Sequence, residues 1–231
     1  MMSSLDIEKG KIGELKTIYA LKHYLDGGQY FVLNFLVIPN GEWTSQLDHT
    51  IISKYGIFVI ETKYTNSWLY GAQNQPRWTE VYHAKRFSFS NPLYQNYSHT
   101  QALAKFLKID KHKIFSVVVF WGDCQFETNM PSNVVKGNSI IKYINSKKQI
   151  LLTDPEKNKI VDQLITLKIK EPVTAILDHN ESVRKRYESN TICPKCGGNL
   201  TMHTAHKGIY LGEKFLGCNN FPRCHYKKAL N

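Results

Sequence analysis

The chain has 231 residues, of which 42% are hydrophobic and 12% aromatic, a composition that predicts a globular core and excludes a disordered chain. Thirty Lys and Arg outnumber nineteen Asp and Glu, which gives a net charge of +11 and an isoelectric point near 9.3. This excess favours a polyanionic partner, with nucleic acid ahead of an acidic membrane surface.

The first eleven residues carry acids and no apolar run, so we expect no signal peptide and a cytoplasmic protein. The longest apolar segments, Phe31–Pro39 and Ile114–Trp121, are too short to span a bilayer and predict buried strands. Five cysteines, an odd number with close CxxC spacing, favour a metal site over disulfide bonds.

In chain order, the first predicted element is an amphipathic helix over residues 8–25, which a pair of glycines ends. Tyr30–Ile38 predicts a strand that is buried on both faces. Leu47–Ile52 and Ile57–Thr62 predict a hairpin, in which Gly56 suits a three-residue loop with a bulge.

The remaining pattern predicts short strands at 67–71, 77–82, 114–120 and 133–135. It also predicts two further helices, at 91–107 and 154–167. Asn91 and Asp154 each precede a proline and are the expected N-caps. The order of elements indicates an α/β domain with a mixed sheet. We therefore divide the chain into a domain over 8–168, a basic linker over 169–190 and a small module over 191–231.

Charged residues end the apolar strand Ile57–Lys63. Glu61 and Lys63 are two residues apart and point to one face, where burial without partners would be costly. A symmetric hairpin would place Asp48 opposite Glu61, whereas a bulge in the turn would favour His49. From the residues alone both registers remain open.

Two carboxylates that converge beside a lysine suit the metal-assisted hydrolysis of a phosphodiester bond. Magnesium prefers oxygen ligands and keeps several waters, so one or two carboxylates and a substrate phosphate can hold it. The metal lowers the pKa of bound water, and a lysine can stabilise developing charge. The alternative is a surface salt-bridge cluster at the end of a strand.

Four ordered motifs in this half of the chain resemble the nuclease-related domain, NERD, a branch of the PD-(D/E)xK endonucleases. They are Gly10-x-x-Gly13-Glu14, Gln46–His49, Gly56–Lys63 and Asn91–Gln95. The resemblance covers roughly residues 8–120. It implies an α/β fold with a restriction-endonuclease-like mixed sheet flanked by helices, and a nuclease that requires Mg²⁺ or Mn²⁺.

The resemblance also implies roles for five residues. Asp48 and Glu61 match the two metal-binding carboxylates, and Lys63 matches the catalytic lysine. Glu14 matches an acidic position that assists the metal site in related nucleases, although a solvated helix position is an equally ordinary role. Gln95 matches a family glutamine that would approach substrate or water, but it could instead bond backbone groups.

The four C-terminal cysteines have the spacing of a zinc site, with ligands Cys193, Cys196, Cys218 and Cys224. Four thiolates form a closed tetrahedral site whose role is structural. A segment of about forty residues cannot build a sufficient core, so Zn²⁺ is expected to supply much of its folding energy. Three histidines, His203, His206 and His225, could substitute as ligands, but a complete set of cysteines makes that unnecessary.

The segment C-P-K-C-G-G-N-L…F-L-G-C-N-N-F-P-R-C-H-Y-K-K closely resembles the C-terminal zinc fingers of type IA topoisomerases, and this resemblance implies binding to DNA, often single-stranded. Exposed aromatic residues can stack on bases and cations can hold phosphates. The expected nucleic-acid contacts are Lys214, Phe221, Arg223, Tyr226, Lys227 and Lys228. Phe215 is expected to pack inside the ribbon.

Most of the excess charge lies near the C-terminus: from residue 184 onward there are nine basic and two acidic residues, seven of the net eleven charges. We therefore expect a metal-dependent nuclease acting on DNA, whose zinc ribbon binds the substrate. The rival hypothesis is a non-catalytic nucleic-acid-binding protein that uses the nuclease fold as a platform. A membrane-binding role is disfavoured because no basic amphipathic helix is visible, and the sequence predicts no oligomeric state.

Overall fold

The structure is a computed structural model, which describes residues 4–41, 43–170, 174–208, 210–222 and 224–230. A five-stranded mixed sheet of order β1-β2-β3-β7-β9 lies at the centre of the N-terminal domain. Its first three strands are antiparallel, and β3, β7 and β9 run parallel. The strands are β1 Phe31–Asn40, β2 Trp43–Ser53, β3 Gly56–Tyr64, β7 Ile114–Trp121 and β9 Val134–Lys136.

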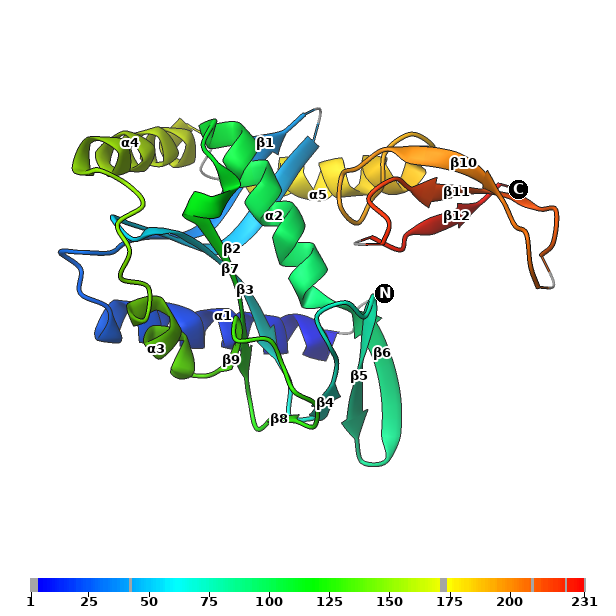
Figure 1. Ribbon diagram of the computed structural model, residues 1–231, viewed down its shortest axis with the longest axis horizontal. Helices are drawn as coiled ribbons and strands as arrows, with labels where there is room; N and C mark the ends of the chain where they lie inside the picture. Colours follow the sequence, from blue (N-terminus) through cyan, green and yellow to red (C-terminus); the bar gives the residue numbers. More distant parts are fainter. Residues whose placement is uncertain (1–3, 42, 171–173, 209, 223, 231) are drawn as a thin grey trace.

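Helices cover both faces of this sheet, as Figure 1 shows. On one face lie α1 (Ser4–Tyr24) and α3 (Ser139–Asn145), and on the other α2 (Pro92–Leu107) and α4 (Asp154–Lys170). Alternation along β3 sends Phe58 and Ile60 toward α1 and α3, and Ile57 and Val59 toward α2 and α4. The predicted α/β fold with a mixed sheet flanked by helices is confirmed.

The β2–β3 hairpin has a two-residue loop, so the expected three-residue loop with a bulge is wrong. Ser53 pairs directly with Gly56, and the register continues without interruption to the pair His49 and Ile60. Gly56 adopts a φ of +121°, and a Cβ there would lie 2.8 Å from the carbonyl oxygen of Lys113. Glycine thus allows β3 to begin at once, and one further step of the register sets Asp48 opposite Glu61.

Helix α1 lies against β3 because a glycine removes the side chain at their contact. A Cβ on Gly13 would lie 3.1 Å from Cγ2 of Thr62. The hydroxyl of Thr17 bonds the carbonyl of Gly13 and the hydroxyl of Thr62, both at 3.1 Å, and accepts a bond from Trp121 Nε1 at 2.7 Å. This close approach brings the next residue, Glu14, to the end of β3 at which Glu61 lies.

Helix α2 begins at the predicted cap and is fixed over the sheet by buried amides. The side chain of Asn91 accepts a bond from the Leu93 N–H at 2.9 Å. The amide of Asn96, fully buried, donates to the carbonyls of Val59 at 2.9 Å and Val117 at 3.0 Å. These bonds determine which face of α2 lies over β3.

The N-cap of α4 is Thr153, one residue before the expected Asp154. The Thr153 N–H donates to Glu156 Oε2 at 2.8 Å, and the Glu156 N–H donates to Thr153 Oγ1 at 3.4 Å. This reciprocal pair is a capping box, which a Thr-x-x-Glu pattern encodes.

A second sheet of order β6-β5-β4-β8 lies beside the first and encloses a small core around Trp78. The indole of Trp78 is fully buried and stacks on Phe120 at 6.1 Å between ring centroids. The sequence pattern predicted β4 and β5 but missed the shorter β8 and the largely exposed β6. The strands are β4 Trp68–Tyr70, β5 Arg77–Tyr82, β6 Lys85–Ser90 and β8 Gln125–Phe126.

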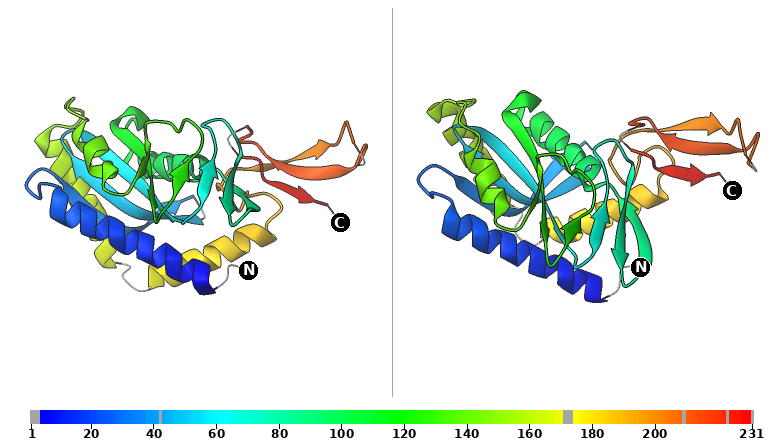
Figure 2. Two further views of the ribbon diagram at one scale, coloured as in Figure 1. Left: turned by 90° about the horizontal axis from the view of Figure 1, so that it is seen from below. Right: turned by 60° about the horizontal axis from the view of Figure 1, so that its bottom comes forward.

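The C-terminal part consists of one helix and a three-stranded antiparallel ribbon. Within the predicted linker, α5 (Thr174–Glu188) packs on β2, and its Arg186 is 6% exposed and donates to the Thr44 carbonyl at 3.4 Å. The ribbon projects beyond the end of α5, as Figure 2 shows from two sides. Its strands are β10 Leu200–Thr204, β11 Lys214–Cys218 and β12 Lys227–Ala229. None of the described helices is long and apolar enough to cross a membrane.

Candidate active site and metal centre

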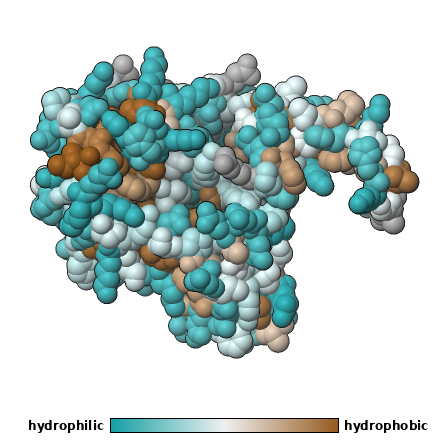
Figure 3. Space-filling model, in the orientation of Figure 1, coloured by the Kyte–Doolittle hydropathy of each residue, from teal (hydrophilic) through white to brown (hydrophobic). Residues whose placement is uncertain are grey.

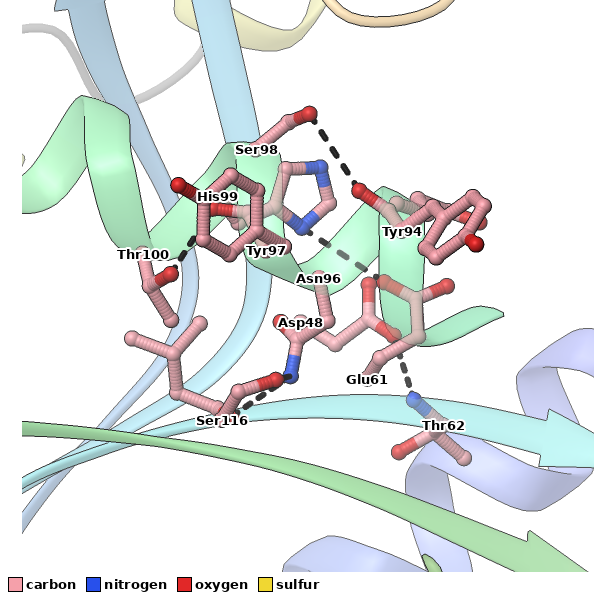
Figure 4. A network of polar contacts seen from close by, with 12 residues as sticks. Asp48, Glu61, Thr62, Tyr94, Asn96, Tyr97, Ser98, His99, Thr100 and Ser116 are labelled. Atoms are coloured by element: carbon pink, nitrogen blue, oxygen red, sulfur yellow. Dashed lines mark hydrogen bonds and ion pairs between the residues drawn. The ribbon is translucent and has the colours of Figure 1, made fainter. Parts of the chain in front are cut away.

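The carboxyl groups of Asp48 and Glu61 lie side by side beneath α2, as Figure 4 shows. They come from adjacent strands, and the symmetric hairpin brings them together. Asp48 Oδ2 accepts a bond from the Thr62 N–H at 2.8 Å. The side chain of Glu61 is only 3% exposed, so this is a partly desolvated pair of acids.

The protonated form of Asp48 is favoured by its surroundings. Burial, and then repulsion from Glu61, raises the pKa of Asp48 well above its ordinary value, despite the opposing effects of the Thr62 N–H and Lys63. The pKa of Glu14 is also raised, by burial and then by Glu61. Glu14 therefore belongs to the same electrostatic cluster as Asp48 and Glu61.

Lys63 provides the nearest cation and joins the sheet to α2. Its Nζ lies 2.5 Å from Glu61 Oε1 and donates to Gln95 Oε1 at 3.2 Å. Burial disfavours its charged form, but attraction to Glu61, with smaller contributions from Asp48 and Glu14, outweighs burial and raises the pKa of Lys63. Lys63 is therefore a cation at neutral pH, and Gln95 helps to hold it.

His99 is a member of this cluster that the sequence reading missed. It follows Gln95 by four residues on α2, so both side chains lie on one face of the helix. His99 Nδ1 is 3.5 Å from Glu61 Oε2, and neither of these buried atoms has a hydrogen-bond partner among the described residues. Burial lowers the pKa of His99, which leaves a neutral imidazole. Its i, i+4 spacing from Gln95 was the available signal.

His49, the alternative to Asp48 in the sequence, points to the other side of β2. Its Nδ1 lies 2.8 Å from Asn34 Oδ1, and its ring packs 6.0 Å from Phe35 between centroids. Burial lowers the pKa of His49 to about 3. His49 is therefore a neutral residue of the sheet interior and not a partner of Glu61.

The acidic cluster fits a divalent cation that retains water ligands. Among the described residues, three or more His, Cys, Asp or Glu ligand atoms lie within 4.8 Å of one another only in the cysteine cluster. The acidic site thus offers Asp48 and Glu61 but no closed cage. Two carboxylates, one with a buried oxygen that lacks a partner, suit Mg²⁺ or Mn²⁺ with waters and a phosphate completing the shell.

The four sulfurs of the C-terminal module form a second metal site of a different kind. All four lie within 4.8 Å of one another, with Cys193 and Cys224 separated by 3.6 Å and Cys196 and Cys218 by 3.3 Å. Zinc bonded to four thiolates at about 2.3 Å in a tetrahedron separates the sulfurs by about 3.8 Å. The site therefore fits Zn²⁺ with the four predicted ligands.

The apolar core of the ribbon is very small. It contains Leu200 and Leu216 beside the cysteines, with Tyr226 packed against them. Phe215 lies outside this cluster, between the ring of His203 and the ammonium of Lys227. The expectation that Phe215 fills the core is therefore wrong, since alternation along β11 turns Leu216 inward instead.

The predicted nucleic-acid contacts of the ribbon occupy different environments. Phe221 is 64% exposed and Lys214 is exposed, while Lys227 lies 5.2 Å above the ring of Phe215. Lys228 caps the C-terminus of α5, where its Nζ donates to the carbonyls of Tyr187, Glu188 and Ser189 and to the side chain of Asn190 at 2.8–3.4 Å. Arg223 lies outside the described residues.

A nuclease-like sheet bearing paired acids, joined to a zinc ribbon, defines the class of this protein. Residues 9–121 match the family model of the nuclease-related domain, and residues 190–231 match that of the topoisomerase DNA-binding C4 zinc finger. The chain therefore belongs to the NERD family and carries a topoisomerase-type C4 zinc ribbon. The first domain indicates a nuclease-like fold, and the second implies nucleic-acid binding.

Two individual relatives match parts of the chain. An uncharacterized protein of Bacillus anthracis is 33% identical to the chain over 168 residues, which are 71% of this chain and 78% of the relative. DNA topoisomerase 1 of Methanocaldococcus jannaschii is 43% identical over 44 residues, which are 19% of this chain and only 5% of the topoisomerase. No solved structure matches the chain.

Proposed function

We propose that this protein is a metal-dependent nuclease that hydrolyses phosphodiester bonds in DNA, with Mg²⁺ or Mn²⁺ held by Asp48 and Glu61. The observation that carries the proposal is the convergence of two buried carboxylates on adjacent strands beside a charged lysine. Burial and repulsion from Glu61 raise the pKa of Asp48, and a divalent cation would remove that cost. A salt-bridge cluster on the surface would not be buried in this way.

The cation would lower the pKa of a bound water and neutralise charge on the scissile phosphate. Lys63, kept protonated by Glu61, is positioned to stabilise negative charge on the phosphate rather than to accept a proton. Gln95 orients the Lys63 ammonium through its Oε1. The imidazole of His99 lies 3.5 Å from the second carboxyl oxygen of Glu61, Oε2.

The zinc ribbon would hold the nucleic acid next to this site, and we propose that the protein acts in the cytoplasm, which cell fractionation would check. The division into a nuclease-like domain, a basic connection and a ribbon supports separate tasks of cleavage and binding. A non-catalytic binding protein is the competing hypothesis. A protein that only binds nucleic acid would not need a buried pair of acids beside a lysine.

The test is a cleavage assay of the purified full-length protein with Mg²⁺ or Mn²⁺. Circular and linear duplex DNA, single-stranded DNA and RNA serve as substrates. Asp48→Asn is expected to abolish cleavage and to leave DNA binding unchanged, whereas Asp162→Asn, the same substitution at an exposed position of α4, leaves both unchanged. Binding by the wild type without cleavage in either metal would establish the non-catalytic hypothesis instead.

A further inference from the structure

Three connected hollows lie between α2 and the zinc ribbon. Their volumes are about 580, 400 and 510 Å³. Tyr97 and Pro222 line both the first and the second, Tyr94 lines both the second and the third, and Cys196 lines both the first and the third. We call these three neighbouring hollows together the α2–ribbon groove. In Figure 3 the ribbon stands out from the body as an arm, which leaves the groove walls on separate parts of the molecule.

The chemistry of the groove favours a negatively charged ligand with hydrogen-bonding groups. Its lining includes Arg77, Lys105 and Lys195, and no Asp or Glu among the described residues. Many of the other polar lining groups are amides, which both donate and accept hydrogen bonds. The amides belong to Asn40, Gln73, Asn74, Asn91, Gln95, Gln101, Asn133, Asn219 and Asn220.

One end of the groove reaches the acidic cluster. Gln95 lines the third hollow and accepts a bond from Lys63, which in turn contacts Glu61. Between a ligand in the third hollow and Glu61 there are therefore only two side chains in this chain of contacts, those of Gln95 and Lys63. The first hollow is lined on the ribbon side by Phe221, which lies between the zinc ligands Cys218 and Cys224 in the sequence.

Exposed aromatic rings in the groove distinguish a single strand from a duplex. Phe221 is 64% exposed, Tyr187 is 53% exposed and Tyr94 is partly exposed. Bases stack on such rings only when they are unpaired, because a duplex keeps its bases stacked on each other and presents phosphates to the protein. Cations alternating with aromatic rings are the usual arrangement for binding single strands.

We propose that the α2–ribbon groove binds one strand of nucleic acid and leads it from the ribbon to the acidic cluster. This inference rests on the proposed nuclease function and specifies its substrate as single-stranded. It assigns binding roles to Tyr94, Lys105 and Lys195, which lie on α2 and on the ribbon and hence on both walls.

The ribbon wall is held in place by contacts that leave the groove open. Lys228 caps α5, and Lys195 Nζ donates to Ser90 Oγ at 3.1 Å across the third hollow. The hydroxyl contact is a weak one that phosphate can replace. When a strand binds, Lys195 would therefore stay in position, and its ammonium would contact a charged phosphate instead of the neutral hydroxyl of Ser90.

The test measures binding without added divalent metal, by fluorescence anisotropy of labelled single-stranded DNA, the matching RNA and the matching duplex. Lys105→Glu and Lys195→Glu should each weaken single-strand binding about fivefold or more and lower the salt slope by about 0.7 per lost phosphate contact. Tyr94→Leu should weaken it by about fivefold or more through lost stacking. Lys142→Glu, an exposed lysine of α3 on the opposite face of the sheet, is the matched control and should have no effect.

Binding and cleavage can fail separately. Loss of single-strand affinity in the groove variants supports the groove even if no substrate is cleaved, in which case only the proposed hydrolysis fails. Equal affinity of these variants and Lys142→Glu, or preference of the wild type for duplex, overturns the groove even if cleavage is observed. The RNA arm shows whether the strand is DNA only or either nucleic acid.

Discussion

The cysteine cluster and the acidic cluster of this protein are built in opposite ways. In the ribbon the metal ligands are themselves the core, since three of the cysteines are buried and only two leucines and a tyrosine accompany them. In the nuclease-like domain the core is large, and the acids lie on the adjacent strands β2 and β3, whose apolar residues pack on both faces of the sheet. We therefore expect the ribbon to need its metal in order to fold, and the nuclease-like domain to fold without one.

This difference explains where charge is tolerated. The sheet can hold Asp48 and Glu61 in a costly arrangement because apolar burial on both faces stabilises the domain. The ribbon has no such reserve, so its thiolates are needed for folding. Each prediction below would change if one of these descriptions were wrong.

The largest effect is expected from removing zinc. Chelation, or Cys218→Ser, should unfold the ribbon, because structural zinc in such modules contributes about 10–16 kcal/mol at neutral pH. Zinc content by metal analysis should fall from one ion per chain, and nucleic-acid affinity should fall with it. The nuclease-like domain should retain its own melting transition. A ribbon that stays folded without metal would contradict the expectation that zinc supplies its folding energy.

Loss of a carboxylate should affect activity rather than folding. Glu61→Gln should reduce metal-dependent cleavage by about three orders of magnitude, because it removes one of two charged ligands. Zinc content should remain one ion per chain, and the far-UV circular dichroism spectrum should be unchanged. Cleavage at the wild-type rate would place the active site elsewhere.

Removal of the lysine should have an intermediate effect on rate. Lys63→Ala should lower kcat by about two orders of magnitude, as for a group that acts mainly in the transition state. Binding of Mn²⁺, measured by calorimetry, should persist because Asp48 and Glu61 remain. Loss of metal binding in this variant would assign Lys63 a different task.

The acidic cluster should make stability depend on pH and metal together. The raised pKa of Asp48 means that the metal-free folded state holds a proton more tightly than the unfolded chain, so stability falls as pH rises from the ordinary carboxyl pKa toward the raised one. Millimolar Mg²⁺ should therefore raise Tm more at about pH 8 than at about pH 5. Asp48→Asn should remove this difference. An equal Mg²⁺ effect at both pH values would contradict it.

The smallest effect concerns the junction between the two regions. Lys228→Met should destabilise the docking of the ribbon on α5 by about 1 kcal/mol, because it removes a charge that bonds the last carbonyls of the helix. Nucleic-acid affinity should change less than in Lys195→Glu. Lys207→Met, at an exposed position of the ribbon, is the matched control. If Lys228→Met lowered the free energy of nucleic-acid binding by more than the free energy of ribbon docking, Lys228 would be a nucleic-acid contact, as the sequence predicted.

Local spacing predicted some parts of this molecule well. The zinc ligands lie in two short segments whose spacing already determines that the thiolates converge, and the N-cap at Asn91 is read from two adjacent residues. The cap at Thr153 was missed by one residue because Asp154 also fits a cap, and only the bonds to Glu156 distinguish them.

The sequence by itself determined the mixed α/β fold, the cysteine cluster and the placement of Glu61 and Lys63 on one face, because each follows from a local period or spacing. Tertiary structure determined which residues contact one another. Gly56 selected the register that pairs Asp48 with Glu61, and packing of α2 brought His99 to the same acids. It also directed Lys228 to α5 and opened the groove between α2 and the ribbon. Such contacts join residues far apart in the chain, and no local pattern encodes them.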